Sequence, residues 1–323
     1  MYTNLTRALG RTGVRSAAVG SGARAFTASA AAQKALKVGY VPEHFSTPLF
    51  FAQSEGYYAE AGVEPTMVPY ISGTGHMIEA LKAKDIDVAV GLTEGFVAGL
   101  GRGLDFYKIV GTYVRSPLRW AISAGANRAD MQSRADLRGA KIGISRIGSG
   151  SYVMPFVLAL QEGWSEPFDF KVLTNFKNLR DGVNDGTADA FMWEIFTSKR
   201  YYDSGEIKQI GIIDTPWPSW TITAHADVVA AERGTLGGFL GAVNRGVAHF
   251  KANPDKAVDY IAANLDYTAE DARAWLATVD FVDDVSTVDM ESTIERTVAV
   301  LKTAGVITDS AFSATAAVDK IEV

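Results

Sequence analysis

One arrangement of strands and helices occurs twice in this chain, and it restricts the possible folds more than any single motif does. In the first copy, residues 37–41 and 64–69 are apolar enough for buried strands, and residues 49–61 between them have helical spacing. A Ser-Gly-Thr-Gly sequence then opens a helix over 76–84, and an apolar strand over 87–92 follows. Strands that alternate with helices at this spacing predict a mainly parallel sheet.

The second copy repeats this order later in the chain. Residues 141–145 and 169–173 are predicted strands, and a Gly-Ser-Gly-Ser sequence between them opens a helix. A helix over 179–184 leads into a last apolar strand over 190–193. Two similar units predict an α/β protein with two similar lobes, each a mainly parallel sheet flanked by helices, with a cleft between them.

Both copies also end in the same way. An aspartate, Asp87 or Asp189, precedes the last strand of the copy. A glutamate, Glu94 or Glu194, follows that strand in what we predict to be a loop. We interpret the two glutamates as matching positions of the two lobes.

The domain organisation depends on two predicted crossings between the lobes. The segment over 108–125 is expected to carry the chain into the second lobe, and the segment over 216–224 to carry it back. We therefore assign residues 36–115 and 219–323 to lobe 1 and residues 116–218 to lobe 2. The C-terminal part has helical spacing, and its helices are expected to pack on lobe 1.

The first 33 residues differ in kind from the rest of the chain. They contain Arg7, Arg11, Arg15 and Arg24, several Ser and Thr residues, and no acidic residue, since the first acid is Glu43. Such a composition is typical of an organelle transit peptide. We predict that residues 1–33 are a cleavable mitochondrial targeting segment and that the mature protein resides in the mitochondrial matrix. A tail with incidental arginines is the alternative.

Composition argues against several classes of function. The chain has no cysteine, which excludes disulfides, thiolate metal sites and cysteine nucleophiles. Its formal net charge of -6 and the lack of a basic stripe argue against nucleic-acid binding. There is no apolar run of about 18 residues, so we expect no transmembrane segment. No group of His, Asp and Glu has metal-ligand spacing, and we expect neither a metal nor a cofactor.

Ligands of open α/β sheets bind beyond the carboxyl ends of the strands, and this rule selects a set of loops here. These loops and the second crossing give the predicted ligand-binding residues Glu43, His44, Phe45, Ser72, Gly73, Thr74, Thr93, Glu94, Arg146, Gly148, Ser149, Gly150, Ser151, Trp193, Glu194, Trp217 and Trp220.

The segment over 146–151 is the best candidate for binding an anion. Its glycines let the backbone approach a ligand, the free N–H groups at a helix start point outward, and the helix dipole favours negative charge. Arg146 can add a charge-assisted hydrogen bond. The segment is not a nucleotide P-loop, because no Gly-Lys-Ser/Thr ending follows. Plain capping of the helix by serine is the alternative.

Aromatic and acidic side chains suggest a second kind of ligand contact. Trp193, Trp217 and Trp220 offer flat faces to a ring or a quaternary amine, although tryptophans also pack in cores. Each glutamate at the end of a copy can pair with an amino group of a ligand, or with Arg115 or Arg119 near the first crossing. The histidines nearest the cleft, His44 and His76, are interpreted as structural rather than catalytic.

Several strings of residues resemble the type II periplasmic-binding fold. They are FFAQSEGYYAEAGVE at 50–64, SGTGHMIEALKAKDIDVAVGLTEG at 72–95 and ADLRGAKIGISRIGSGS at 135–151. They are most similar to the branch that holds the alkanesulfonate, taurine and nitrate binding proteins and the fungal thiamine-pyrimidine synthases. DAFMWE at 189–194 and PWPSW at 216–220 resemble a narrower, uncharacterised fungal and bacterial subgroup known from a Candida albicans member. The resemblance covers nearly everything after residue 35.

The resemblance implies two lobes, two crossing strands and a ligand that stabilises the closed state. In the pyrimidine synthases a lysine and a histidine follow the third strand, and the matching positions here are Thr93 and Val97. The iron-binding cysteine cluster of those enzymes is also missing. Both departures argue against that chemistry, and we assign no catalytic residue.

The sequence therefore favours a non-catalytic protein that binds a small anionic or zwitterionic metabolite in the cleft. An enzyme of thiamine-pyrimidine precursor or related metabolism, using residues other than the family's lysine and histidine, is the alternative. Bacterial relatives dock on membrane transporters, but we expect no transporter partner, since a mitochondrion offers no obvious importer of that kind. The sequence leaves the ligand and the oligomeric state open.

Overall fold

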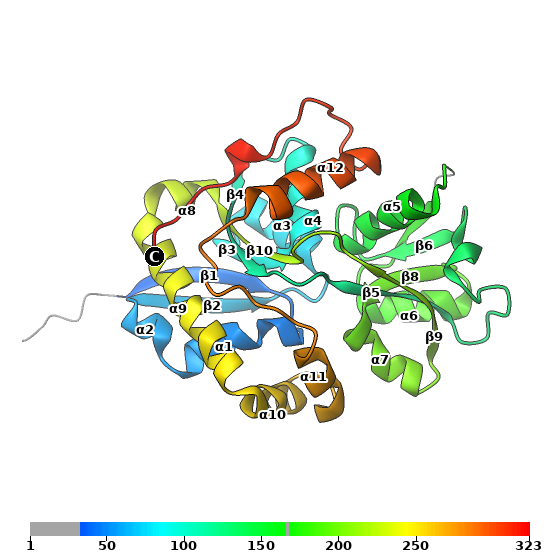
Figure 1. Cartoon of the computed structure of the whole chain (residues 1–323), viewed down its shortest axis with the longest axis horizontal. Coiled ribbons are helices and arrows are strands. Elements are labelled where there is room, and N and C mark those ends of the chain that lie inside the picture. Colours follow the sequence, from blue (N-terminus) through cyan, green and yellow to red (C-terminus); the bar gives the residue numbers. More distant parts are fainter. Residues whose placement is uncertain (1–32, 166–167) are drawn as a thin grey trace, which may run out of the picture. The chain divides into compact units, whose positions relative to one another are not determined.

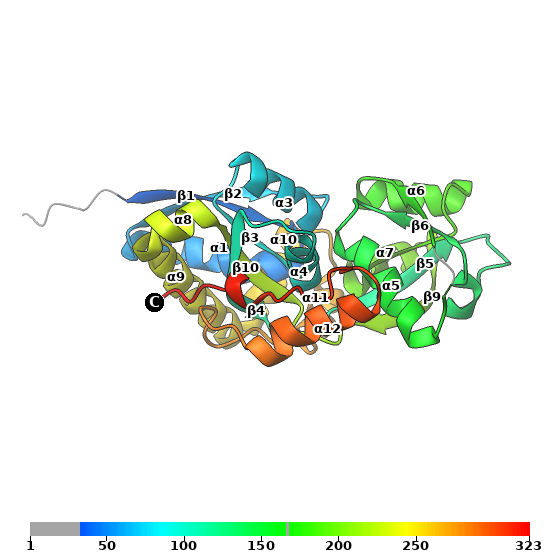
Figure 2. The same cartoon turned by 90° about the horizontal axis from the view of Figure 1, so that it is seen from above.

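The computed structural model describes residues 33–165 and 168–323, and residues 33–323 form one compact unit. Within this unit, two five-stranded sheets lie side by side, each flanked by helices (Figure 1). The same separation of the two sheets is visible from above in Figure 2. The predicted targeting segment lies, except for its last residue, outside the described residues.

The first sheet defines lobe 1 and has the strand order β2-β1-β3-β10-β4. Its strands are β1 (Lys34–Tyr40), β2 (Val63–Pro69), β3 (Val88–Leu92), β4 (Tyr107–Val114) and β10 (Trp220–His225). β1 is parallel to β2 and β3, whereas β10 is antiparallel to both β3 and β4. The sheet is therefore mainly parallel, with β10 as its one inverted strand.

The second sheet defines lobe 2 and repeats this topology in the order β7-β6-β8-β5-β9. Its strands are β5 (Arg119–Gly125), β6 (Lys141–Ile144), β7 (Asp169–Val172), β8 (Ala190–Glu194) and β9 (Ile207–Asp214). Here β5 is the inverted strand, antiparallel to β8 and β9. The mainly parallel α/β architecture predicted from the internal repeat is confirmed.

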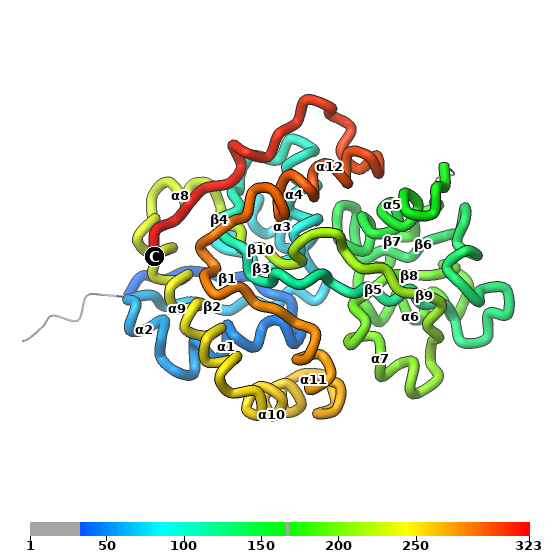
Figure 3. The backbone as a smooth tube through the Cα atoms, in the orientation of Figure 1, coloured from blue at the N-terminus to red at the C-terminus, as the bar shows by residue number. Residues whose placement is uncertain are grey.

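The chain crosses between the lobes twice, and the two crossings are bonded to each other. It leaves lobe 1 after β4 and returns after β9, as the backbone trace in Figure 3 shows. The Leu118 N–H donates to Thr215 Oγ1, and the Thr215 N–H donates to the Leu118 carbonyl at 3.0 Å. Ser219 Oγ donates to the Ser116 carbonyl at 2.7 Å. These bonds tie the crossings into one two-stranded connection.

Helices cover both sheets because their apolar faces need a second layer. Lobe 1 carries α1 (Thr47–Ser54), α2 (Tyr57–Glu60), α3 (Thr74–Ala83), α4 (Thr93–Gly101), α8 (Ala226–Ala231), α9 (Arg233–Ala252), α10 (Pro254–Asn264), α11 (Ala269–Leu276) and α12 (Arg296–Thr303). Lobe 2 carries α5 (Gly150–Glu162), α6 (Phe176–Asp185) and α7 (Ile195–Asp203). Short turns of other helix types are His44–Ser46, Arg134–Leu137, Met290–Glu295 and Thr315–Ala317.

The long helix α9 shows how the C-terminal part is fixed to lobe 1. Its apolar face is buried, and it packs along α1. A Cβ atom at Gly246 would lie only 2.3 Å from the carbonyl oxygen of Pro48, so this close approach needs a glycine. α9 is one of the helices that the helical spacing of the C-terminal part predicts.

Two predicted elements differ from the structure. The single helix expected over 49–61 is divided into α1 and α2, because Gly56 adopts a left-handed conformation with φ of 75°. The turn expected at Thr93 and Glu94 is the beginning of α4. Residues 93–100 are all buried, and a helix pairs their backbone groups where no water can reach them.

The two glutamates interpreted as matching positions are not equivalent. Glu194 is the last residue of β8 rather than a loop residue, and its side chain caps α7 by accepting from the Thr197 N–H. In the strand registers, Trp120 pairs with Glu194 and Trp220 pairs with Leu92. The position in lobe 1 that matches Glu194 is therefore Leu92.

Candidate functional site

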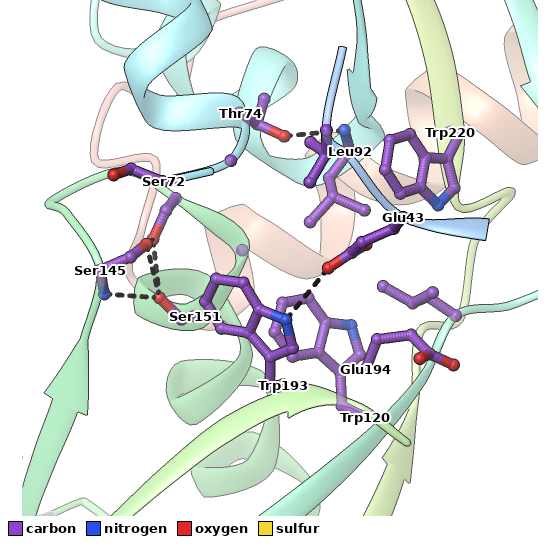
Figure 4. A pocket seen from close by; sticks show the side chains of 15 residues that line it. Glu43, Ser72, Thr74, Leu92, Trp120, Ser145, Ser151, Trp193, Glu194 and Trp220 are labelled. Atoms are coloured by element: carbon purple, nitrogen blue, oxygen red, sulfur yellow. Dashed lines mark hydrogen bonds between the residues drawn. The ribbon is translucent and has the colours of Figure 1, made fainter. Parts of the chain in front are cut away.

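A cavity lies between the two lobes and is walled by both of them. The space between its walls, about 400 Å³, includes open solvent. Lobe 1 contributes Val41, Glu43, Ser72, Gly73, Thr74, Leu92 and Trp220. Lobe 2 and the first crossing contribute Leu118, Trp120, Ser145, Ser149, Gly150, Ser151, Trp193 and Glu194 (Figure 4).

Three tryptophans form the aromatic part of this wall. Trp120 on β5 and Trp220 on β10 occupy matching positions of the two inverted strands, and Trp193 lies on β8. Trp120 is 3% exposed and Trp220 is 2% exposed. The indole N–H groups of these two residues are buried and have no acceptor among the described residues. Because buried donors are normally paired, each of these N–H groups lacks, within the described part of the chain, the acceptor that a buried donor usually has.

Two carboxyl groups, one from each lobe, also reach the cavity. Glu43 follows β1 and accepts a hydrogen bond across the cleft from Trp193 Nε1, at 3.1 Å from its Oε1 atom. Burial raises the pKa of Glu43 to about 7, although this hydrogen bond lowers it. Burial raises the pKa of Glu194 to about 8, and repulsion from Glu43 adds to the rise. Near neutral pH each of the two carboxyl groups is therefore protonated in part of the molecules.

His44 lies behind Glu194 rather than in the cavity wall. Its Nε2 atom is 3.6 Å from Glu194 Oε2, which is longer than a hydrogen bond. The ring packs against Tyr267 and Trp275, with centroids 4.3 Å and 4.2 Å away. Burial lowers the pKa of His44 well below its ordinary value. His44 is therefore neutral at physiological pH and supplies no positive charge to Glu194.

Three serine hydroxyls meet at the beginning of α5. Ser145 Oγ lies 3.1 Å from Ser149 Oγ and 3.2 Å from Ser151 Oγ. Ser149 precedes the first residue of α5, but its hydroxyl donates to the Arg146 carbonyl and does not cap the helix. A Cβ atom at Gly150 would lie 2.6 Å from Leu92, so glycine lets this end of α5 reach the opposite lobe.

Ten of the predicted ligand-binding residues line the cavity. They are Glu43, Ser72, Gly73, Thr74, Ser149, Gly150, Ser151, Trp193, Glu194 and Trp220. They come from loops that are far apart in sequence, and the structure brings them together because the strands of both sheets end at the cleft.

The structure places seven predicted residues outside the cavity wall. Phe45, like His44, lies behind the wall, and its ring stacks on Trp220. Thr93 donates its hydroxyl to the Pro218 carbonyl, and the Glu94 carboxyl accepts from Trp217 Nε1 at 2.9 Å. The side chains of Thr93, Glu94 and Trp217 are therefore buried away from the cavity. Thr93 and Glu94 lie on α4, which begins directly at the end of β3.

The remaining two, Arg146 and Gly148, belong to the contact between the lobes. Gly148 is covered by the guanidinium of Arg102, the residue that follows α4, and the Arg146 side chain lies against Gly75 of α3. The pairing suggested for the arginines of the first crossing is wrong. Arg115 binds Asp280 at 2.8 Å and Arg119 binds Asp214 at 3.2 Å, so neither pairs with the glutamates.

Five residues of the wall were not predicted: Val41, Leu92, Leu118, Trp120 and Ser145. Trp120 is the most informative of them. The sequence Trp-Ala-Ile-Ser-Ala at 120–124 matches Trp-Thr-Ile-Thr-Ala at 220–224, and both begin an inverted strand. This second internal similarity would have identified Trp120 from Trp220.

The two positions that correspond to the synthase lysine and histidine are also away from the cavity. Thr93 is bonded to the second crossing, as described above, and Val97 is fully buried in α4. Among the described residues, no group of three or more His, Asp or Glu side chains is arranged to hold a metal ion. Within the same part of the chain, no helix is long and apolar enough to cross a membrane.

Two sheets of matching topology, two crossings and a cavity walled by both lobes define a protein of the periplasmic-binding type. Within that class, the chain belongs to the family of Ca3427-like periplasmic binding proteins, whose sequence profile matches residues 120–213. The Candida albicans CA3427 gene product, described as defining a new family with the generic periplasmic binding protein fold, is 44% identical. The match covers 90% of this chain and 97% of the Candida chain, with a TM-score of 0.84.

More distant solved structures share the fold alone. The alkanesulfonate-binding protein SsuA from Xanthomonas axonopodis pv. citri, bound to MOPS, is 16% identical with a TM-score of 0.71, over 86% of this chain and 96% of its own. The periplasmic nitrate-binding protein NrtA from Synechocystis PCC 6803 is 18% identical with a TM-score of 0.60, over 74% and 69%. No curated protein sequence matches this chain at a significant level.

Proposed function

We propose that this protein binds a small anionic or zwitterionic metabolite in the cleft between its lobes and does so without catalysis. The observation that carries the proposal is the cavity itself, since both lobes wall it and two buried indole N–H donors in the wall have no acceptor among the described residues. A ligand acceptor that pairs with these donors would offset the free energy of burying them unpaired. The donors lie on different lobes, Trp120 on β5 and Trp220 on β10.

Binding is proposed to be coupled to closure of the lobes. In the structure the lobes already meet beside the cavity, where Trp193 donates to Glu43 and Thr197 Oγ1 lies 2.7 Å from the Tyr267 hydroxyl. A ligand that contacts both lobes at once favours the closed arrangement over any open one. The two-stranded connection of the crossings is the natural hinge for this movement.

The ligands of two structural neighbours support the choice of chemistry. The Xanthomonas neighbour is an alkanesulfonate-binding protein bound to MOPS, and the Synechocystis neighbour is a nitrate-binding protein. In this chain, the beginning of α5 is the part of the wall that suits an anionic group, because helix N-termini present free N–H groups and a favourable dipole.

A thermal-shift screen with the indole donors removed one at a time tests the proposal. Sulfonates, carboxylates, pyrimidines and pyridoxal phosphate are suitable probes. A ligand at about a hundred times its Kd should add about 2.7 kcal/mol of stability, or roughly 5 °C in Tm. W120F and W220F keep an aromatic ring but lose the N–H group, and each should reduce the shift.

Trp164 provides the matched control, because it packs in lobe 2 away from the cavity. W164F should leave the ligand shift unchanged. If no compound changes the Tm, or if all three variants respond as the wild type does, binding in this cavity is refuted.

An enzymatic role in thiamine-pyrimidine precursor or related metabolism is the second candidate. The supporting observation is that Glu43 and Glu194 line the cavity with pKa values of about 7 and about 8, which suits proton transfer at neutral pH. Restoration of growth in a fungus that lacks pyrimidine synthase would favour this candidate. Restoration by E43Q and E194Q as well as by the wild type would exclude these carboxyls as its acid and base.

A further inference from the structure

The charged side chains that line the cavity are all acidic. Two carboxyl groups line it, Glu43 with 9% and Glu194 with 5% exposure, and the lining residues include no Lys, Arg or His. Glu43 has no ion pair among the described residues, and its polar partner is the neutral Trp193 indole. Glu194 accepts from the Thr197 N–H and hydroxyl, which are also neutral donors. A purely anionic ligand would therefore be repelled at this end of the cavity.

Buried carboxylates without a cationic partner are unfavourable unless something compensates them. Protons can do so, because burial raises the pKa of both groups. A positively charged nitrogen of a ligand can replace those protons and bind carboxyl groups of both lobes at once. Contact with both lobes is also what closure requires.

The aromatic wall fits the same kind of group. Trp193 donates to Glu43, Trp120 pairs with Glu194 in the strand register, and Trp220 lines the same cavity (Figure 4). Indole faces attract cations, and the effect is strongest where water is excluded. The carboxyl end of the cavity therefore combines negative charge with aromatic faces, the combination that binds ammonium groups.

The opposite end of the cavity has the reverse polarity. It holds the serine hydroxyls at the beginning of α5, where the helix N-terminus contributes partial positive charge. The Arg146 carbonyl accepts from Ser149 beside this end, and the Arg146 side chain lies against Gly75 of α3. Its Nε atom is buried and has no hydrogen-bond partner among the described residues.

The next step rests on the proposed binding function and specifies the charges of the ligand. We infer that the ligand is a small zwitterion, with a positively charged nitrogen between Glu43 and Glu194 and an anionic group at the beginning of α5. Simple sulfonate or nitrate anions, which lack the nitrogen cation, are excluded as preferred ligands. The cleft is therefore expected to prefer a ligand that carries a positive and a negative charge at opposite ends.

Sets of matched compounds test this inference by calorimetry. One set is taurine, ethanesulfonate and ethylamine, and the other is para-(aminomethyl)benzoate, para-toluate and para-methylbenzylamine. In each set the first compound carries both charges, the second only the anion and the third only the cation. The zwitterion should bind at least tenfold more tightly than either partner compound. An anion that binds as tightly as its zwitterion would overturn the inference.

Neutral variants show whether the carboxyl groups make this distinction. E43Q and E194Q keep an oxygen for their hydrogen-bond donors and remove the negative charge. Each should weaken binding of the zwitterion by about tenfold and leave binding of the anion equal or tighter. E94Q is the matched control, because Glu94 is equally buried but does not line the cavity. Equal losses of zwitterion affinity in E94Q and E194Q would contradict the assignment.

A small-molecule extract separates failure of this inference from failure of the proposed function. The protein is incubated with the extract and washed, and the retained compounds are identified by mass spectrometry. A retained compound with both a basic nitrogen and an acid supports the inference. A retained compound without a basic nitrogen overturns the inference but preserves the binding function. If neither the extract nor any of the six compounds is bound, the binding function itself fails.

Discussion

Glu94 carries a carboxyl group into the interior of lobe 1, where its polar partner is a tryptophan. Trp217 Nε1 donates to its Oε2 atom, and its Oε1 atom has no hydrogen-bond partner among the described residues. Burial raises the pKa of Glu94 to about 7, and no charged side chain contributes to this rise. The group can therefore be interpreted as a neutral acid that holds the second crossing against α4.

This assignment predicts how stability depends on pH. In the unfolded chain Glu94 loses its proton near the ordinary pKa of 4.5, whereas in the folded protein it keeps the proton until about 7. The folded state binds more protons between these values, so stability falls as pH rises through this window. E94Q should remove this fall, which amounts to about 3 kcal/mol for a fully buried group. Urea unfolding at pH values across the window measures it.

The comparison between variant and wild type isolates this one group. Glu43 and Glu194 titrate in both proteins and cancel in the difference. The exposed Glu64 of β2 gives the control E64Q, which should keep the wild-type pH dependence. An E94Q variant with an unchanged pH dependence would show that Glu94 is already ionised in the folded protein.

At the scale of elements, α7 of lobe 2 and the segment leading into α11 of lobe 1 hold the lobes together outside the cavity. Tyr201 donates to Asp266 at 3.1 Å, and Arg200 forms an ion pair with the same carboxylate. Lys199 pairs with Asp271 at 3.2 Å. In the closure proposed above, these contacts stabilise the closed arrangement without touching a ligand in the cavity.

D266A should therefore weaken ligand binding although the cavity is unchanged. Loss of both partners lowers the population of the closed, binding-competent state, and the apparent Kd rises in proportion. Because the pair is exposed, the effect should be modest, roughly three- to tenfold. Calorimetry with a ligand from the screen measures it. D255A breaks an exposed ion pair with Arg273 inside lobe 1 and should leave the Kd unchanged; equal effects of the two would refute a role in closure.

The sequence predicted helices and strands well where burial determined them. It also predicted the part of the cavity wall that lies beyond the ends of parallel strands. Ser149, Ser151 and Trp193 were found because parallel strands bring their carboxyl ends to one edge of a sheet. Trp120 was missed for the same reason, since an inverted strand brings its beginning to that edge. Glu94 was selected by the same rule because it follows β3, but α4 begins directly there and the side chain is buried.

At the scale of the whole chain, we propose that the first 33 residues direct the protein to mitochondria. Residues 1–33 fused to a fluorescent protein should bring it to mitochondria in fungal cells. Replacement of the four arginines by glutamine should leave the fusion in the cytosol, because import depends on positive charge in a segment without acids. A fusion that remains in the cytosol with its arginines intact would contradict the proposal.

The inverted strand of lobe 1 has a consequence for how the protein is made. Lobe 2 is continuous in sequence, so its sheet can be complete as soon as β9 has left the ribosome. In lobe 1, by contrast, β3 and β4 stay unpaired on their facing edges until β10 has been synthesised, after all of lobe 2. Domains generally fold as units during synthesis. A chain that has emerged from the ribosome through residue 214 but not yet through residue 220 should therefore hold a finished lobe 2 attached to an unfinished lobe 1, although lobe 1 was begun first.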